Sequence, residues 1–184
     1  VPHVEVISGE PFDQYCEDHL FTPLGMDGAS WFLAGLDADD VAMPYRRTFA
    51  GRFVPYGHYG YPDYPDGQLR VSVNDFGPFI GAMANGGVWN GVRILEADTV
   101  EEMLSIQYPV LSGDQGLVWY YGDHGGTRAA GHGGGDRGVT TDMFIVPGDG
   151  VAVAVFTNGE IAGATEWAAL YAIENRLLEE AANY

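Results

Sequence analysis

The sequence predicts an α+β fold in which an antiparallel sheet of three to four strands is flanked by helices. Three helix-like segments within the first 106 residues are followed by four short strand-like runs between 116 and 158 and by a final amphipathic helix over 165–181. With 184 residues, of which 46% are apolar, the chain is long enough for one core and short for two. Because no repeat or linker divides it, we expect a single domain over 1–184.

The first predicted helix lies within residues 8–22. Ser8 or Gly9 opens it, Pro11 lies in its first turn, and it is expected to stop before Pro23. The residues that share one face at helical spacing are Phe12, Tyr15, Cys16, His19 and Leu20. Cys16 is therefore expected to be a buried structural thiol, and a single cysteine permits no internal disulfide.

Residues 36–68 contain many glycines, prolines and aromatic residues and are predicted to form a long irregular surface loop. A second helix follows Ser72, which with Asp75 resembles a capping box, and Gly86–Gly87 is its stop signal. Its predicted buried stripe consists of Phe76, Phe79, Ile80 and Met83. A third, short helix is predicted near 97–106, with Asp98 or Thr99 as its cap.

The predicted strands are separated by glycine-rich turns and cover 116–121, 128–134, 139–146 and 151–158. The last two are joined by "PGDG", a strong hairpin signal. The closing helix is expected to bury one apolar face made of Trp167, Leu170, Tyr171, Leu177 and Leu178.

The charge balance restricts the partners. The chain has 26 acidic residues against 8 basic ones, all arginine, which gives a formal net charge of −18. Such a field repels nucleic acid and anionic membranes, so we expect neither as a partner, and its simplest interpretation is a solubility surface. No run approaches the roughly 18 to 20 apolar residues that a membrane-spanning helix needs. Residues 1–11 lack the pattern of a signal peptide, and the chain is expected to begin inside a secondary-structure element. The sequence therefore does not predict the cellular location of the protein.

The stretch "AGHGGGDRGV", residues 130–139, has three interpretations. Gly133, Gly135 and Gly138 spell G-x-G-x-x-G, but a strand-like run follows instead of the helix that a phosphate site needs, so no nucleotide cofactor is expected. His132 and the next three glycines imitate the oxyanion loop of lipases, yet no G-x-S-x-G motif follows.

The third interpretation is a strand edge against which substrate lies, with backbone N–H groups of 133–135 facing a carbonyl oxygen. The alternative is a glycine bulge with a solvated histidine, and the residues alone leave both open. A metal site is not expected, because the spacing of the candidate ligands matches no known geometry. Those candidate ligands are Asp123, His124, His132 and Asp136.

Four segments in order resemble the serine β-lactamase-like hydrolases, which include class C β-lactamases, D-alanyl-D-alanine peptidases and related esterases. The segments are "EVISGEPFDQYCEDHLFTPLGM", "VSVNDFGPFIGAMANGG", "RILEADTVEEML" and "GHGGGDRGVTTDMFIVPGDGVAVAVFTN". The resemblance covers nearly the whole chain and implies the C-terminal portion of a β-lactamase/penicillin-binding-protein-like fold.

The resemblance implies that His132, Gly133 and Gly134 form the family's third active-site motif, K-T-G or H-x-G. Gly135 would donate an oxyanion-hole N–H, and His132 would orient substrate and tune proton transfer. Gly133 replaces the usual hydroxyl residue, which removes one side-chain hydrogen bond to substrate. In the aromatic loop 53–66, Tyr56 and His58 are expected to face substrate; the alternative is a self-packed surface loop.

The chain also departs from the family pattern. The family's nucleophile and base come from S-x-x-K, and this chain has no lysine. The second motif, Y-x-N, is expected to precede residue 5, and Ser72-Val-Asn74 is interpreted as a helix cap. We therefore expect an incomplete C-terminal part that is inactive alone.

The whole enzyme would form an acyl-enzyme with an ester, amide or lactam, without a cofactor. Its expected partner is an N-terminal complementing segment or a homo-oligomer formed through an exposed sheet edge. Members of the family are often exported. The alternative function is a non-catalytic binding module that keeps the scaffold.

Overall fold

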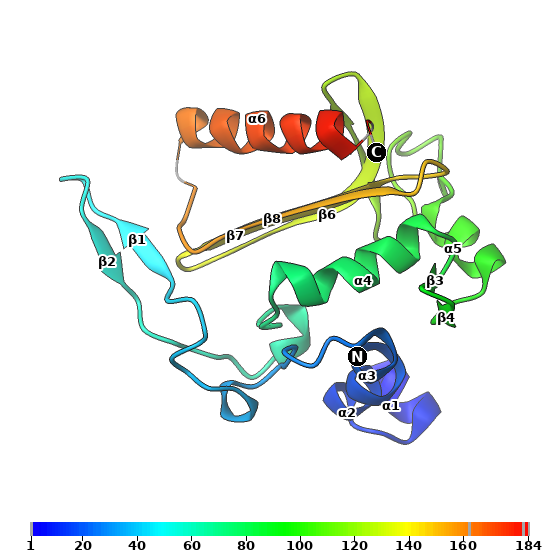
Figure 1. Ribbon diagram of the computed structural model, residues 1–184, viewed down its shortest axis with the longest axis horizontal. Helices are drawn as coiled ribbons and strands as arrows, with labels where there is room; N and C mark the ends of the chain where they lie inside the picture. Colours follow the sequence, from blue (N-terminus) through cyan, green and yellow to red (C-terminus); the bar gives the residue numbers. More distant parts are fainter. Residues whose placement is uncertain (1, 162, 182, 184) are drawn as a thin grey trace.

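A four-stranded antiparallel sheet, with strand order β5-β6-β7-β8, lies between a helix on each face (Figure 1). The computed structural model describes residues 2–161, 163–181 and 183. The sheet strands are β5 (Tyr120–His124), β6 (Thr127–Asp136), β7 (Val139–Val146) and β8 (Val151–Thr157). Helix α4 (Val73–Ala84) covers one face and α6 (Ala164–Ala181) covers the other. The predicted α+β class and antiparallel sheet are confirmed.

The strands follow the predicted runs closely except at the start of the sheet. The "PGDG" turn closes the β7–β8 hairpin, in which Val146 pairs with Val151. By contrast, β5 begins four residues later than predicted. Val118 adopts a positive φ of 58°, and the Gly116 N–H bonds to the Trp119 carbonyl, so the chain turns before the strand starts.

The N-terminal helix does not stop before Pro23, so that prediction was wrong. Helix α2 (Phe12–Cys16) continues through a π-helical turn, η1 (Glu17–Phe21), into α3 (Thr22–Leu24). A π turn shifts the hydrogen bonding by one residue just where proline lacks an N–H, which lets the helix continue. It ends at Gly25, which has a φ of 70°. An additional helix, α1 (Pro2–Ser8), precedes it.

The predicted start and stop of α4 are confirmed, and of its predicted buried stripe Ile80 and Met83 are buried, whereas Phe76 and Phe79 are only partly buried. The Asp75 N–H donates to the Ser72 Oγ at 3.0 Å, so Ser72 is the N-cap, and Gly86 and Gly87 follow the helix with positive φ values. Helix α5 (Ala97–Leu104) begins after Glu96. It has no side-chain cap, so the prediction of Asp98 or Thr99 was wrong.

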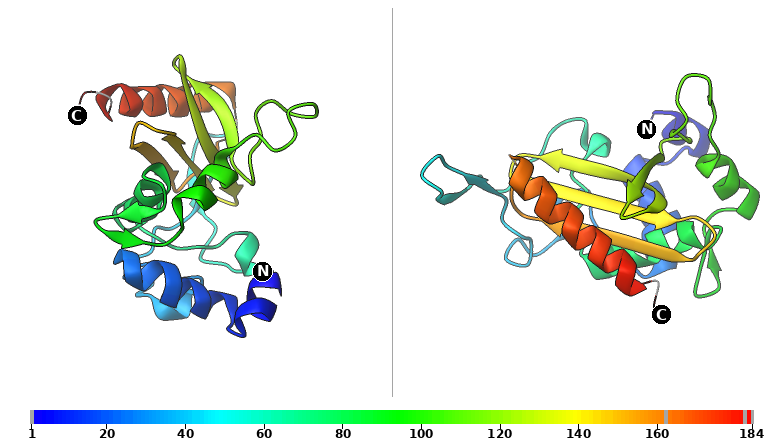
Figure 2. Two further views of the ribbon diagram at one scale, coloured as in Figure 1. Left: turned by 90° about the vertical axis from the view of Figure 1, so that its right-hand side faces the viewer. Right: turned by 90° about the horizontal axis from the view of Figure 1, so that it is seen from above.

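The region 36–68 was predicted to be irregular, but part of it forms regular structure. It contains a hairpin of β1 (Tyr45–Arg47) and β2 (Phe53–Pro55). It also contains a 3-10 turn, η3 (Tyr64–Asp66), and another 3-10 turn, η2 (Leu33–Gly35), lies just before the region. The β1–β2 hairpin projects from the body of the molecule (Figures 1 and 2). A second small hairpin, β3 (Val88–Trp89) and β4 (Val92–Arg93), turns at Asn90–Gly91.

The buried face of α6 differs from the predicted one. Leu170, Glu174 and Leu178, spaced four residues apart, face the sheet, whereas Trp167, Tyr171 and Leu177 are exposed. An acidic residue therefore occupies the middle of the buried stripe, a position that apolar periodicity cannot identify.

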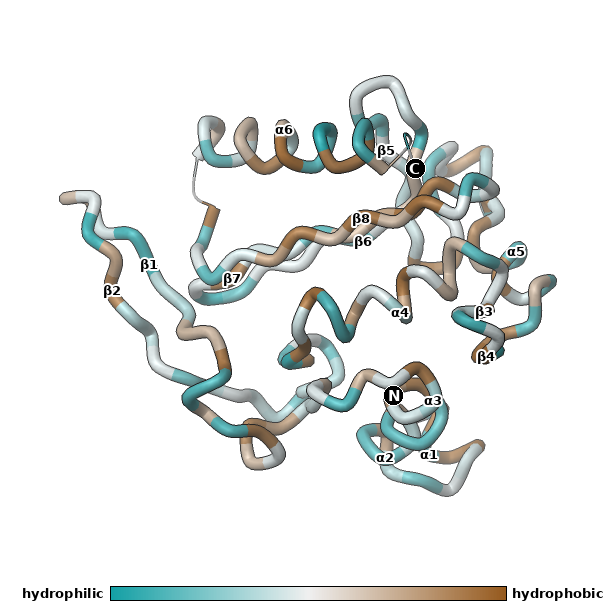
Figure 3. The backbone as a smooth tube through the Cα atoms, in the orientation of Figure 1, coloured by the Kyte–Doolittle hydropathy of each residue, from teal (hydrophilic) through white to brown (hydrophobic). Residues whose placement is uncertain are grey.

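Three apolar clusters hold the layers together. One joins α4 to its face of the sheet through residues such as Met83 and Ile145, and another joins α6 through Phe144 and Leu178. The third surrounds Cys16, which is buried as predicted, and includes Ala82 of α4. Figure 3 shows these apolar stretches along the central strands, whereas β1 is hydrophilic. Among the described residues, no helix is long and apolar enough to cross a membrane.

Candidate functional site

The second half of β6 has a neighbour on one side only. Strand β5 pairs with β6 as far as Gly131, which lies opposite Tyr120. From His132 to Asp136, the pairing within the described residues is with β7 alone. The glycine-rich stretch is thus a free strand edge, as the third interpretation of the sequence expects.

Alternation along β6 separates the stretch into two faces. His132, Gly134 and Asp136 share the face toward α4, because His132 lies opposite Met143, which packs in the α4 cluster. Gly133 and Gly135 share the other face, toward α6, with Gly133 opposite Asp142. The candidate site residues are therefore consecutive in the chain, but alternate residues face opposite sides of the sheet.

A cavity of about 860 Å³, here called the His132 cavity, lies between the sheet and the N-terminal end of α4. His132 and Thr141 line its sheet side, while Ser72 and Asp75 line its helix side. The Ser72 Oγ donates to the Asp75 carboxylate at 2.9 Å while it caps the helix. The serine that faces this cavity is thus held in a structural role.

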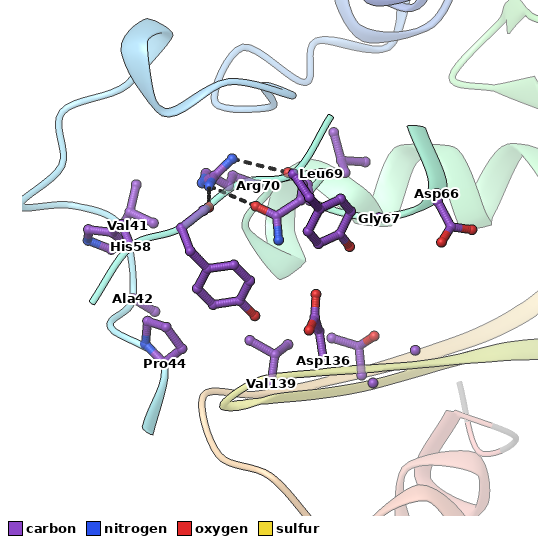
Figure 4. Close-up of a pocket in the computed structure, with 16 residues that line it drawn as sticks. Val41, Ala42, Pro44, His58, Asp66, Gly67, Leu69, Arg70, Asp136 and Val139 are labelled. Atoms are coloured by element: carbon purple, nitrogen blue, oxygen red, sulfur yellow. Dashed lines mark hydrogen bonds between the residues drawn. The ribbon is translucent and has the colours of Figure 1, made fainter. Parts of the chain in front are cut away.

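A smaller cavity of about 400 Å³, here called the glycine cavity, adjoins the first and shares Arg70 and Thr141 with it. Figure 4 shows it with Asp136 below and Arg70 above. Gly134 and Gly135 also line it, so both cavities open onto the free edge of β6.

The His132 imidazole is exposed and held by two contacts. Its Nδ1 lies 2.8 Å from the Gly133 carbonyl oxygen, and its ring meets the Tyr120 ring edge-on at 5.5 Å. Because a carbonyl oxygen only accepts, Nδ1 carries the proton in this contact. In the neutral ring, Nε2 is then the acceptor.

The two loop residues predicted to face substrate occupy different places. His58 lines the glycine cavity, opposite Gly134 and Gly135. The Tyr56 hydroxyl instead donates to Glu160 at 2.7 Å, and the same carboxylate oxygen accepts from the Gly138 N–H at 3.1 Å. Tyr56 therefore ties the loop to the β6–β7 turn, beside the cavity and not among its lining residues.

Sequence reasoning missed three residues of the glycine cavity: Tyr59, Tyr61 and Arg70. Burial, with the nearby Asp136 as a smaller contribution, raises the pKa of Tyr59 to about 12, and burial likewise raises the pKa of Tyr61. Both phenols therefore stay neutral at physiological pH.

Arg70 positions the aromatic loop against the body. Its guanidinium donates to the backbone carbonyls of Trp31, Gln68 and Tyr59, the last at 2.7 Å. The aromatic content of the loop 53–66 is the signal that points to Tyr59 and Tyr61, although only Tyr56 and His58 were expected to face substrate.

A second titratable cluster lies behind the glycine strand, under α6. Glu174 is 0% exposed, and within the described part of the chain neither of its carboxylate oxygens has a hydrogen-bond partner. His124 Nδ1 lies 3.8 Å from its Oε2, and the His124 ring stacks on Phe144. Burial, together with the nearby Asp142 carboxyl, raises the pKa of Glu174 to about 7, and burial also raises the pKa of Asp142.

The described residues contain no group of three or more histidine, cysteine, aspartate or glutamate side chains that could hold a metal ion. Of the candidate ligands named from the sequence, His132 lies on the α4 face of the sheet, whereas His124 packs beneath α6. Both histidines nevertheless line one cavity of about 470 Å³ beside β5 and β6.

Comparison with known proteins places these features in a family. The family model described as Beta-lactamase matches residues 3–175. A curated relative, penicillin-binding protein 4 of Amycolatopsis lactamdurans, is 26% identical over 179 residues, which cover 86% of this chain and 44% of the relative. The chain therefore spans less than half of that relative's length.

Solved structures share the fold. The D-amino acid amidase from Ochrobactrum anthropi SV3 superposes with a TM-score of 0.76 at 20% identity, covering 97% of this chain and 52% of that one. The octameric penicillin-binding protein homologue from Pyrococcus abyssi gives a TM-score of 0.69 at 23% identity, covering 93% and 40%.

Proposed function

The chain belongs to the beta-lactamase family, and on this premise we propose that it is the C-terminal part of a serine hydrolase that acts through an acyl-enzyme on esters, amides or lactams. The names of the penicillin-binding relative and of the amidase favour lactams and amides of D-amino acids among these substrates. The chain's span of 44% of the relative supports the view that further catalytic groups come from another segment.

One observation carries this proposal: the unpaired edge of β6 from His132 to Asp136 borders two adjoining cavities. A substrate main chain laid along this edge meets a strand with no side chains at 133, 134 and 135. The Gly135 N–H is then the proposed oxyanion donor for the reacting carbonyl, a role that a backbone N–H fills without any reorganisation.

His132 is proposed to orient substrate and to accept a proton through Nε2, since Nδ1 is engaged by the Gly133 carbonyl. Gly134 gives the substrate access to the α4 face of the strand, and His58 borders the same cavity from the loop. Gly133 contributes backbone only, so no hydroxyl at this position recognises a substrate carboxylate.

The nucleophile is proposed to come from an N-terminal complementing segment that carries S-x-x-K and Y-x-N and borders the His132 cavity. Its serine Oγ would attack the substrate carbonyl and pass its proton to the lysine–tyrosine pair. The leaving group takes a proton as it departs, and water then hydrolyses the acyl-enzyme. The structural role of Ser72 and the lack of lysine in the sequence support a nucleophile and base that come from outside this chain.

The test is complementation with the polypeptide encoded immediately upstream, provided that it contains S-x-x-K and Y-x-N. The mixture should hydrolyse a nitrophenyl ester and incorporate a serine-directed phosphonate on the S-x-x-K serine, whereas either part alone should do neither. In the mixture, His132→Ala should lower kcat/KM by roughly 10²- to 10⁴-fold, the usual range for acid–base groups.

Two results would contradict the proposal. The first is hydrolysis of the ester by the purified 184-residue chain alone, with phosphonate-sensitive turnover. The second is a complemented mixture that stays inactive although the two parts co-elute. The second result would favour a non-catalytic binding module. Two observations fit that alternative: Ser72 serves as a helix cap, and the cavities are open to a ligand.

A further inference from the structure

The charges of this chain are segregated along its sequence. Residues 1–45 contain nine acidic residues and no basic residue, whereas residues 41–62 contain three arginines and no acidic residue. The three arginines, Arg46, Arg47 and Arg52, all belong to the β1–β2 hairpin, here called the arm (residues 44–56). The arm is thus a cationic element on a strongly anionic molecule.

The arm is ordered although it projects into solvent. Its tip is closed by backbone hydrogen bonds from Thr48 N to Arg52 O at 2.8 Å and from Gly51 N to Thr48 O at 2.9 Å. Its base is held by Tyr45 N to Asn158 O at 3.0 Å and by the Arg47–Glu166 ion pair at 2.9 Å. A preformed arm loses little conformational entropy when it binds.

The arm presents exposed aromatic rings and two arginines that are unpaired among the described residues. Phe49 at the tip is 115% exposed and Phe53 is 66% exposed. Among the described residues, Arg46 and Arg52 make no side-chain hydrogen bond or ion pair, whereas Arg47 pairs with Glu166. Exposed aromatic rings flanked by unpaired arginines are the composition typical of interface anchors.

The complementary surface lies on the N-terminal helical region, residues 2–24. It exposes Val6 and Ile7, at 84% and 85%, and carries exposed carboxylates on Glu17 and Asp18. The arm projects from one end of the molecule and the N-terminal helices lie toward the other (Figures 1 and 2). An arm therefore cannot reach the helical region of its own chain.

We propose that the arm of one copy docks on the N-terminal helical region of a second copy. Arg46 and Arg52 then face the Glu17 and Asp18 carboxylates, while Phe49 and Phe53 cover Val6 and Ile7. Since the two surfaces differ, the contact is either reciprocal, which gives a two-fold dimer, or head-to-tail, which gives a ring or a filament. This inference is independent of the proposed hydrolase function.

The experiment is sedimentation velocity of the 184-residue chain over a micromolar concentration series, with charge-swapped variants. Wild type should self-associate. Arg46→Glu with Arg52→Glu should weaken association by at least about tenfold, and Glu17→Arg with Asp18→Arg should do the same. An equimolar mixture of these two variants should associate again, because each native or swapped arm then meets a face of opposite charge.

The matched control reverses two surface arginines elsewhere, Arg128→Glu with Arg176→Glu, and should associate like wild type. Phe49→Ser should also weaken association, since this fully exposed ring has no role in folding. Circular dichroism of each variant verifies that it is folded.

The proposal is overturned if wild type stays monomeric throughout the series, if the arm variant associates as wild type does, or if the mixed variants stay apart. Arm-dependent co-sedimentation of a monomeric wild type with phosphatidylserine vesicles would also overturn it, because the arm's partner would then be an anionic membrane.

Discussion

Titratable side chains lie on both sides of the glycine-rich strand. His132 is exposed at the cavities, whereas Glu174 is buried behind the strand with Asp142 and His124 around it. A carboxyl group that is buried without a hydrogen bond is tolerated when it stays protonated, since burial penalises the charged form. Glu174 therefore couples the docking of α6 to pH.

Glu174→Gln should remove a pH dependence of stability. The folded pKa of Glu174, about 7, lies above the value of 4.5 expected in the unfolded chain. Its stabilising contribution is thus complete below pH 4.5 and is lost as the pH rises to about 7, amounting to roughly 3 kcal/mol. Urea unfolding of both proteins should give similar stabilities at pH 4.5 and a more stable variant at pH 8.

Glu179→Gln, on the exposed side of the same helix, is the control and should follow the wild-type profile. Parallel profiles for wild type and Glu174→Gln from pH 4.5 to 8 would contradict the assignment of this dependence to Glu174.

At the scale of elements, the glycines of β6 serve two purposes. A Cβ at Gly131 would lie 2.2 Å from the Met143 carbonyl oxygen and 2.7 Å from the Phe144 Cβ, so this glycine is required for packing. A Cβ at Gly133 would meet no atom closer than 3.8 Å, and one at Gly135 would meet nothing within 4 Å. Gly133 and Gly135 are therefore dispensable for the sheet, which is consistent with a role for them at the strand edge.

Gly131→Ala should destabilise the protein by about 1–3 kcal/mol, the usual cost of overpacking, because the β6–β7 backbones must move apart. Gly133→Ala, two residues along the same strand and on the same face, should change stability by less than about 0.5 kcal/mol. Thermal unfolding followed by circular dichroism measures both. Equal effects would show that strand propensity, and not the close contact, determines the need for glycine at 131.

On the scale of the whole molecule, α4 joins the sheet to the N-terminal helices. Met83 packs in the cluster with the sheet, whereas Ala82 packs in the cluster around Cys16. Phe76 and Phe79 contact both clusters. Since the clusters share one helix, they should unfold together.

The single cysteine reports on this cooperativity. Cys16 is buried in the N-terminal cluster, so a thiol reagent should label it only when that cluster opens. Labelling across a urea series should coincide with the loss of sheet signal in circular dichroism. Met83→Ala, which leaves a core cavity on the sheet side, should cost about 2–5 kcal/mol and shift both transitions together. Labelling of Cys16 at lower urea than the sheet transition would contradict a shared core.

Much of the fold was predictable because local signals agree with the final packing. Ser72 and Asp75 predict the start of α4, and "PGDG" predicts the β7–β8 hairpin. The β3–β4 hairpin carried an equally strong signal, Asn90–Gly91, which was overlooked. Pro23 was misjudged, since its effect depends on the π turn that precedes it.

The sequence by itself determined the α+β class, the strand order along the chain and the family resemblance, because periodicity, turn residues and motif order are local properties. Only the tertiary structure decided which glycines pack and which form an open edge, that Tyr56 binds Glu160 while His58 lines the cavity, and that Glu174 is buried. These outcomes depend on which distant segments meet across the sheet, and a side chain's burial and pKa follow from its neighbours in space.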